Sequence, residues 1–502
     1  MYKVGFDTDK YLKEQSEYIL RRVESSEKLY LEFGGKLIGD KHAKRVLPGF
    51  DEDAKMKLLA TLKDKSEIII CVYAGDIERN KIRGDYGITY DRDVLRLIDE
   101  YRAYGIPVNS VLITRYKEQP NVKIFMSKLE RSGVSVHTHH DIEGYPTNVE
   151  AIMGEEGFAR NTYIKTTKPL VVVTAPGAGS GKLATCLNQM YHEYNHGKKA
   201  SYAKFETFPV WNMPIKHPVN IAYEAATVDL KDVNMMDNYH FEAYGKVAVN
   251  YNRDVEMFPV IKRIIEKITG EPAEYKSPTD MGVNRLKSGI TDEEAVVEAA
   301  KEEIIRRAFS VENDFKKGLA DEDTLRRMQL ILEELDLKKE HRNPVRVARA
   351  YAKEVEERLD DAALQAVIAI ELNNGKVITG RTSTLMDASA AAVLNCLKAL
   401  ANVADEIDLL APMILETIQR LKIDELNSKV PTLSANELLI ALAISAVTNP
   451  TAQLAYKQLG HLKDAQAHST VIMNHENEQT IKMLGIDITN DPVYATENLY
   501  YN

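Results

Sequence analysis

A glycine-rich loop between two apolar segments limits what this chain can fold into more than any other feature. Residues 170–173 are an apolar run typical of a buried strand, and residues 183–190 are amphipathic, as in a helix. The loop between them reads Pro176-Gly-Ala-Gly-Ser-Gly-Lys182. Strand, glycine-rich loop and helix in this order make a phosphate-binding turn, because free N–H groups at the helix start face an anion. The predicted ligands are Gly177, Gly179, Ser180, Gly181 and Lys182.

The loop departs from the common nucleotide-binding pattern G-x-x-x-x-G-K-[ST] at two positions. Pro176 stands where the first glycine belongs, and Leu183 replaces the Ser or Thr that would hold magnesium. Thr185 follows two residues later, but it points to a different side of the helix. These departures favour an anion site over a standard nucleotide-hydrolysing site. The alternative is an ordinary strand-to-helix turn whose glycines allow close packing.

Length and composition indicate a large globular protein. A chain of 502 residues has room for about three domains, and its 44% hydrophobic residues suffice for well-filled cores. The net charge of −10 argues against nucleic acid or an anionic membrane as the main partner. The three cysteines, Cys71, Cys186 and Cys396, are too far apart for a disulfide framework or a cysteine zinc site. With no apolar signal or membrane-spanning run, we expect a cytoplasmic protein.

Strand-like and helix-like segments alternate through the first 288 residues. The predicted strands are 28–33, 67–73, 108–114, 134–137 and 170–173, and the predicted helices are 10–25, 51–62, 91–103 and 121–131. Strands that alternate with helices are typical of an α/β fold with a doubly wound, mostly parallel sheet. Ligands of such sheets bind at the carboxyl ends of the strands, where the glycine loop at residues 176–182, a P-loop-like segment, lies.

The composition changes near residue 290. A capping box at Thr291-Asp-Glu-Glu294 starts a charged region with helical periodicity. Further on, Asn373-Asn-Gly375 separates two apolar runs, 363–372 and 376–379, and indicates a β-hairpin. Alanine-rich helices follow at 387–403 and 434–447. We therefore predict an α/β domain at 1–288, a helical subdomain at 289–345 and a smaller C-terminal α+β domain at 346–502.

Residues 204–254 are rich in Asn, Asp, His and Pro, which predicts a loop system beside the glycine loop. Polar loops on a rigid scaffold often carry functional groups. The candidate magnesium ligands are Asp229, Asp232 and Asp237, and the candidate general acids or bases are His217 and His240. The alternative for each residue is that it caps a turn or a helix end.

A further candidate anion pocket lies at residues 379–384. Arg381, Thr382 and Ser383 precede a helix that begins near Asp387. Hydroxyl groups and a guanidinium at a helix start suit a phosphate or a carboxylate. An ordinary helix cap explains the same residues equally well.

Several long motifs make the chain resemble bacterial domain-of-unknown-function family 1846. The motifs are 31–36, 45–50, 171–177, 179–182, 184–187, 203–209, 217–220, 222–227, 249–255 and 277–283. Residues 284–290 depart from the pattern expected of the family. The resemblance implies an α/β core with a helical insertion, and it implies no established activity.

Together these features predict an enzyme that binds a nucleotide or another phosphorylated small molecule at the glycine loop. Its reaction would be phosphoryl transfer or ATP-dependent ligation, with ATP or another nucleotide and magnesium as cofactors. The alternative is a non-catalytic sensor or scaffold that binds a phosphorylated metabolite. We also expect a homo-oligomer, because the apolar residues of 292–337 are too dense for one core-facing stripe.

Overall fold

The protein has an α/β fold with two main sheets, one of six strands and one of four. The computed structural model describes residues 3–83, 86–359 and 366–496. The chain divides into two compact units, one of Val4–Ala300 and one that begins at Lys301. Each unit has its own sheet and is described by itself.

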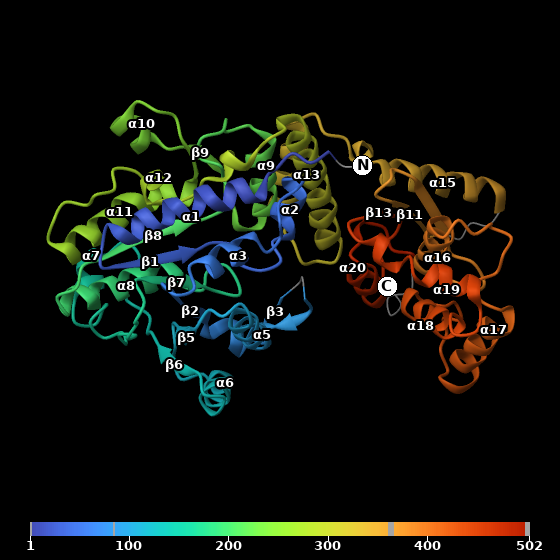
Figure 1. Cartoon of the computed structure of the whole chain (residues 1–502), viewed down its shortest axis with the longest axis horizontal. Helices are drawn as coiled ribbons and strands as arrows, with labels where there is room; N and C mark the ends of the chain where they lie inside the picture. The colour runs from blue at the N-terminus through green and yellow to red at the C-terminus, as the bar shows by residue number, and fades with distance from the viewer. Residues whose placement is uncertain (1–2, 84–85, 360–365, 497–502) are drawn as a thin grey trace. The chain divides into compact units, whose positions relative to one another are not determined.

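A six-stranded parallel sheet forms the centre of the first unit (Figure 1). Its strands are β1 (Lys28–Phe33), β2 (Ser66–Tyr73), β5 (Val108–Thr114), β6 (Ser135–Thr138), β7 (Leu170–Thr174) and β8 (Ala200–Phe205). Their order across the sheet is β6-β5-β2-β7-β1-β8. The strand that precedes the glycine loop therefore lies between β2 and β1, near the middle of the sheet.

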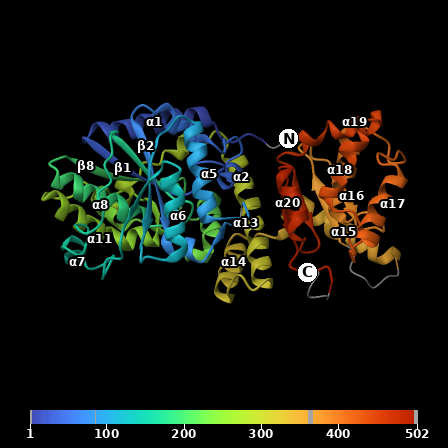
Figure 2. The same cartoon turned by 90° about the horizontal axis from the view of Figure 1, so that it is seen from below.

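Both faces of this sheet are covered, which explains why the central strands β2 and β7 are largely apolar without alternation. On one face, Tyr30, Cys71 and Val173 pack in one core with Cys186 of α8 (Lys182–Asn195) and Phe258 of α11 (Asn252–Thr269). Figure 2 shows α8 and α11 on this side and α1 (Thr8–Glu24) on the other. The strand ends between these layers are held in fixed positions.

Other helices and two small ladders complete the first unit. The helices are α2 (Lys41–Val46), α3 (Ala54–Thr61), α4 (Ala74–Glu78), α5 (Tyr90–Ala103), α6 (Pro120–Arg131), α7 (Val149–Met153), α9 (Pro218–Ala226), α10 (Asn238–Tyr244) and α12 (Pro278–Met281). The ladders pair β3 (Ile82–Arg83) with β4 (Ile88–Thr89), and β9 (Asn234–Met236) with β10 (Val249–Tyr251). The prediction of a pure loop system at 204–254 was wrong, because this region contains α9, α10 and the β9–β10 ladder.

The second unit has a four-stranded mixed sheet in the order β12-β11-β13-β14. Its strands are β11 (Val367–Glu371), β12 (Val377–Arg381), β13 (Gln466–Ser469) and β14 (Asp487–Asn490). The pairing of β11 with β12 confirms the predicted hairpin, and Gly375 in its turn has a φ of 82°. The first residues of the predicted strand, 363–365, lie outside the described residues.

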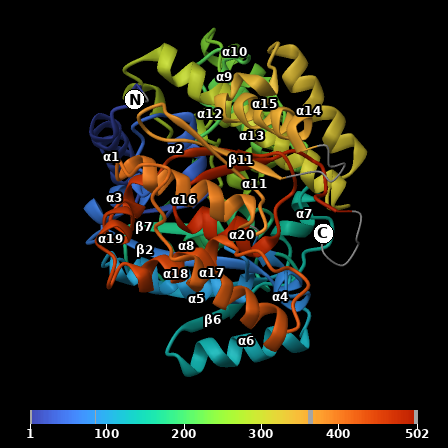
Figure 3. The same cartoon turned by 90° about the vertical axis from the view of Figure 1, so that its right-hand side faces the viewer.

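Helices cover both faces of the mixed sheet. Val367 and Ala369 of β11 pack under α15 (Asn343–Leu359), whereas Ile368 and Ile370 face α16 (Ala388–Leu400). Figure 3 shows α15 and α16 on opposite sides of β11. The remaining α-helices are α13 (Glu293–Lys316), α14 (Glu322–Glu334), α17 (Pro412–Arg420), α18 (Ala435–Ser445), α19 (Pro450–Tyr456) and α20 (His475–Met483). None of the described helices has both the length and the apolar character needed to cross a membrane.

Helix α13 begins one residue later than the predicted capping box implies. Asp292 provides the cap, because its Oδ1 accepts a hydrogen bond from the Ala295 amide at 3.1 Å. Thr291 instead donates its own amide to the carbonyl of Gly5 at 2.9 Å. The boundary between the two units falls within α13, so neither unit coincides with the predicted subdomain 289–345. The three-part division at 288 and 345 stays a prediction.

Candidate functional site

The glycine loop lies at the carboxyl edge of the six-stranded sheet, between β7 and α8. Gly179 and Gly181 adopt left-handed conformations, with φ of 69° and 85°. Gly177 has a different reason to be glycine, because a β-carbon there would lie 2.5 Å from the Tyr90 hydroxyl oxygen. The glycines therefore shape the loop and let an aromatic ring approach its backbone.

The carbonyl groups of the loop are turned toward donors of the protein. Thr114 Oγ1 donates to the carbonyl of Ser180 at 2.9 Å, and Arg115 Nη2 donates to that of Gly179 at 2.7 Å. The buried Ser180 hydroxyl donates to the carbonyl of Gly177 at 2.9 Å. Side chains therefore fix three loop carbonyls: Thr114 at the end of β5, Arg115 directly after it, and Ser180 within the loop.

The amide groups of the same loop have no such partners. No described residue accepts a hydrogen bond from the backbone N–H groups of residues 177–184. Gly181 caps α8 and has no side chain that could accept one. Unpaired N–H groups that converge at a helix start form a concave site for an anion. The backbone here therefore offers unpaired hydrogen-bond donors, and anion binding at this loop stays a prediction.

Lys182 adds a positive charge at this helix start. Its side chain is half-buried and makes no hydrogen bond or ion pair within the described ranges. Leu183 packs partly against the core that α8 shares with the sheet. The helix start therefore presents an ammonium group but no hydroxyl at the position where nucleotide-binding P-loops hold magnesium.

A second group of charged side chains lies at the ends of β1 and β8. Lys204 Nζ bonds both carboxylate oxygens of Asp254, at 2.7 and 2.6 Å, and the Tyr251 hydroxyl at 3.1 Å. Glu206 Oε1 lies 3.3 Å from the same ammonium. Glu32 is paired with Lys204 in the register of β1 and β8, and it accepts a 2.7 Å hydrogen bond from Tyr202. Three carboxyl groups thus surround one lysine.

These neighbours perturb two of the groups strongly. The pKa of Glu206 is raised to about 8, mainly by burial, with the charges of Asp254 and Glu32 also raising it and Lys204 opposing them. The pKa of Lys204 is raised despite burial, because Asp254, Glu206 and Glu32 are all negative. A carboxyl group that titrates near neutral pH is suited to proton transfer.

The glycine loop with α8 and the charged cluster around Lys204 lie on the same face of the sheet. Tyr30 and Tyr202, which share the strand faces of Glu32 and Lys204, pack in the same core as Cys186 of α8. The pKa of the Cys71 thiol is raised to about 12, mainly by burial, while the Thr185 hydroxyl and the charge of Lys182 lower it and the charge of Glu32 raises it. Glu32 and Lys182 therefore act on one buried thiol from the same side of the sheet. A common cleft for the loop and residues 204–254 remains a prediction.

The three candidate magnesium ligands are not gathered into one site. Asp232 forms a two-bond ion pair with Arg253, at 2.5 and 2.7 Å. Asp237 caps α10 and accepts two hydrogen bonds from Thr279, whereas Asp229 is exposed in the short 3-10 helix Val228–Leu230. Among the described residues, no three His, Cys, Asp or Glu side chains form a group that could hold a metal ion.

Both candidate histidines have structural contacts. His217 Nδ1 accepts the Val219 amide at 3.2 Å and so caps α9, while its Nε2 lies 2.9 Å from Glu293. Burial lowers the pKa of His217, against the opposing effect of Glu293. His240 Nδ1 lies 3.0 Å from the Ser277 hydroxyl in the contact between α10 and α12. His217 therefore matches the alternative of a helix cap, and a role of either histidine in proton transfer stays a prediction.

The second candidate anion pocket belongs to the unit that begins at Lys301. Arg381 ends β12 and donates to the carbonyl of Thr382 at 3.3 Å. Ser383 Oγ accepts the amides of Leu385 and Met386, at 3.2 and 3.1 Å. Arg381, Thr382 and Ser383 thus form the turn that leads to α16. Whether they bind an anion stays a prediction.

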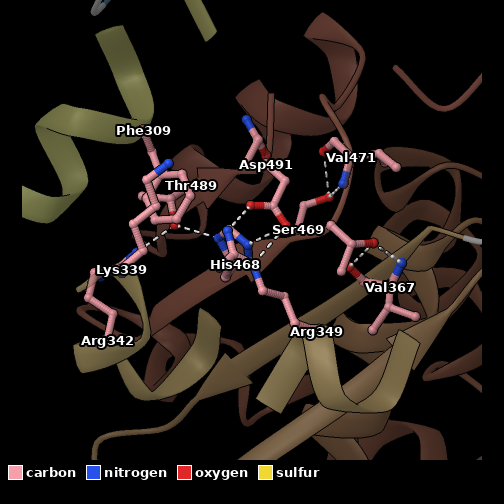
Figure 4. Close-up of polar contacts among 12 residues, drawn as sticks. Phe309, Lys339, Arg342, Arg349, Val367, His468, Ser469, Val471, Thr489 and Asp491 are labelled. Carbon is pink, nitrogen blue, oxygen red and sulfur yellow. Dashed lines mark hydrogen bonds and ion pairs between the residues drawn. The ribbon is translucent and has the colours of Figure 1, made fainter. Parts of the chain in front are cut away.

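A buried charged network in the same unit was not predicted (Figure 4). His468 is fully buried, with Nδ1 2.9 Å from the Thr489 hydroxyl and Nε2 3.3 Å from Asp491. Arg349 bonds both oxygens of Asp491, and the buried Arg342 donates to Thr489 at 2.5 Å. The Asp491 carboxylate is neutralised by the Arg349 guanidinium, and the Thr489 hydroxyl already accepts a hydrogen bond from Arg342. We therefore interpret this network as a structural support of β13 and β14.

Sequence reasoning also missed Glu32, although a signal was present. The segment Leu29-Tyr-Leu-Glu-Phe33 is a buried strand with one carboxylate, and two glycines follow it directly. A charge near the carboxyl end of an otherwise apolar parallel strand indicates a functional edge. Glu206 lay within the predicted region, but nothing in the sequence showed that β1 and β8 would be neighbours.

Comparison with known proteins identifies the family. A model of the N-terminal part of domain of unknown function DUF1846 matches residues 4–336, and a model of its C-terminal part matches residues 340–500. The chain belongs to the DUF1846 family. This confirms the resemblance that the sequence motifs indicated. The function of the family is unknown.

Relatives of this DUF1846 protein are similar over their full length. A UPF0371 protein of Clostridium botulinum Type A is 62% identical over 500 residues, which cover all of both chains. A UPF0371 protein of Clostridium tetani is 61% identical over the same length. One from a Clostridium botulinum Type E3 strain is 59% identical. These names describe no activity, so the function has to be argued from the site.

Proposed function

We propose that this protein is an enzyme that binds a nucleotide or another phosphorylated small molecule on the loop between β7 and α8. The observation that carries the proposal is the set of unpaired amide groups at residues 177–184 beside an unpaired Lys182. Backbone N–H groups and an ammonium at a helix start match the oxygens and the charge of a phosphate group.

The topology of the sheet supports this location. From β2 the chain continues outward to β5 and β6, whereas from β7 it continues past β1 to β8. Neighbouring strands whose connections leave in opposite directions form a crevice at their carboxyl ends, which is the usual ligand site of a doubly wound sheet. We propose that the sheet is of this kind, and that the P-loop-like segment occupies this crevice between β2 and β7.

We propose phosphoryl transfer or ATP-dependent ligation as the reaction. Lys182 and the loop amides would stabilise charge on the transferred phosphate. We assign proton transfer to Glu206 rather than to His217 or His240, because Glu206 titrates near neutral pH at the same edge. Magnesium would enter with the nucleotide, since this ion commonly keeps waters and phosphate oxygens as most of its ligands.

Calorimetry on a lysine variant tests the proposal. We expect Lys182→Ala to weaken binding of inorganic pyrophosphate or ATP by roughly ten- to a hundredfold, because charged hydrogen bonds contribute about 1.5–3 kcal/mol. Lys198→Ala, which removes an exposed lysine just beyond the other end of α8, is the matched control and should leave the affinity unchanged. Equal affinity of Lys182→Ala and the parent for every phosphate ligand would contradict the proposal.

The second candidate function is a phosphometabolite sensor or scaffold that forms a homo-oligomer. Pro176 and Leu183 favour it, because both remove parts that a nucleotide-hydrolysing loop uses. In α14, Met328 and Ile331 are buried, but Leu330 is 57% exposed and is available to a partner. We expect light scattering to give at least twice the 56.6 kDa of one chain. A mass near 56.6 kDa would end the oligomer proposal and leave the enzyme proposal unaffected.

A further inference from the structure

At the sheet edge beside the glycine loop, the carboxyl group of Glu206 has hydrogen-bonding capacity that the protein does not use. The ammonium of Lys204 is held by both oxygens of Asp254, so Glu206 is its weaker partner at 3.3 Å. Among the residues that the structure describes, none contacts Glu206 Oε2 through a hydrogen bond or ion pair. The Glu206 side chain is also 22% exposed. One oxygen of this carboxyl group therefore remains available to a ligand.

Gly34 brings this carboxyl group toward the loop. A β-carbon at Gly34 would lie 2.7 Å from Glu206 Oε1, so the Glu206 side chain crosses the end of β1. β1 is the direct neighbour of β7, from which the phosphate loop starts. Neighbouring strands lie about 4.8 Å apart. The ends of β8 and β7, from which Glu206 and the loop extend, are thus two strand spacings apart across the sheet, or about 10 Å, a span close to the length of a sugar phosphate.

We propose that the phosphorylated ligand carries a sugar whose hydroxyl groups bind Glu206 while its phosphate occupies the loop at residues 177–184. This inference rests on the proposed function and specifies its substrate class. A second anionic group at this position would be repelled by Asp254 and Glu32, and an apolar group would leave the Glu206 oxygen without a partner. Hydroxyl groups suit it, because they both donate and accept hydrogen bonds.

The surroundings of Glu206 make its role dependent on pH. The charged and titratable groups that act on it are Lys204 of β8, Asp254 and Arg253 of α11, Glu32 of β1 and Tyr223 of α9. With a pKa near 8, Glu206 is mostly uncharged at pH 7 and tolerates a nearby phosphate. Above pH 8 it becomes a carboxylate and repels the phosphate. Affinity for the sugar phosphate should therefore fall as the pH rises from 7 to 9.

Calorimetry with defined probes tests this inference. The probes are inorganic phosphate, ribose 5-phosphate, glucose 6-phosphate and AMP, each titrated into the full-length protein and its Glu206→Ala and Glu206→Gln variants. In the parent we expect at least one sugar-bearing probe to bind about tenfold more tightly than inorganic phosphate. The comparison of AMP with the two sugar phosphates shows whether the sugar belongs to a nucleotide.

The variants separate this inference from the proposed function. Glu206→Ala should remove the tenfold advantage and leave the affinity for inorganic phosphate unchanged. Glu206→Gln should keep part of the advantage, because an amide still bonds hydroxyls, and should abolish the change between pH 7 and 9. Equal affinity for phosphate and all sugar probes in the parent, or an advantage that survives Glu206→Ala, overturns the inference. If neither phosphate nor any sugar probe binds, the proposed function fails with it.

Discussion

Replacing Gly380 with alanine is expected to destabilise the protein by about 3 kcal/mol, at the upper end of what overpacking a core costs. Gly380 lies in β12, where α16 passes directly over the strand. A β-carbon there would lie 2.5 Å from the Cα of Ala392 and 2.7 Å from the carbonyl carbon of Ala391. These are backbone atoms, so the clash is relieved only if the whole helix moves.

Gly460→Ala is the matched control for this prediction. Gly460 belongs to the same unit, has no positive φ, and has open space where a β-carbon would go. We expect its free energy of unfolding to stay within about 0.5 kcal/mol of the parent. Urea unfolding followed by circular dichroism measures both variants. If Gly380→Ala were as stable as Gly460→Ala, the packing of α16 on β12 described here would be incorrect.

Gly181→Val is expected to reduce phosphate binding by a hundredfold or more. Gly181 has a φ of 85°, which a β-branched residue strongly disfavours, and a β-carbon there would crowd Thr114 at 3.1 Å. Relief of this strain rotates the peptide groups on both sides of residue 181. The amides that converge at the start of α8 would then point away from the anion.

Gly197→Val is the control that separates backbone strain from loss of the site. Gly197 follows α8 at its other end, with a φ of 76° and open space around it. This variant should lose stability through similar strain but keep the affinity for pyrophosphate. Calorimetry gives the affinities, and circular dichroism shows whether both variants are folded. Equal losses of affinity in the two variants would show that strain alone, rather than the loop amides, is responsible.

Much of the fold could be predicted because its strands are buried on both faces. The bounds predicted for β1 and β5, 28–33 and 108–114, are those of the structure, because both mostly apolar segments lie between residues that favour turns or solvent, such as Gly34, Pro107 and Arg115. The hairpin at Asn373-Asn-Gly375 was equally predictable, because its turn needs the positive φ that Gly375 provides. Local chemistry decides these elements, so a single sequence is sufficient to find them.

The candidate site was predictable only in part. The glycine loop follows from its own spacing, but Asp237 and His217 show the limit of such reasoning. Both are residue types that occur in metal and catalytic sites, and both cap short helices here. Glu32 and Glu206 come together only because β8 pairs with β1 rather than with β7. Sheet order depends on long-range packing, which residue patterns do not reveal.

The most direct test of the account is to observe the loop amides themselves. Amide resonances of the isotope-labelled, full-length protein can be followed while inorganic pyrophosphate is added to millimolar concentration. Hydrogen bonds from residues 177–184 to phosphate oxygens should shift these amide protons downfield, together with the side-chain ammonium of Lys182. We expect saturable shifts confined mainly to this loop and the first turn of α8. Unchanged resonances for these residues at saturating pyrophosphate and ATP would contradict it.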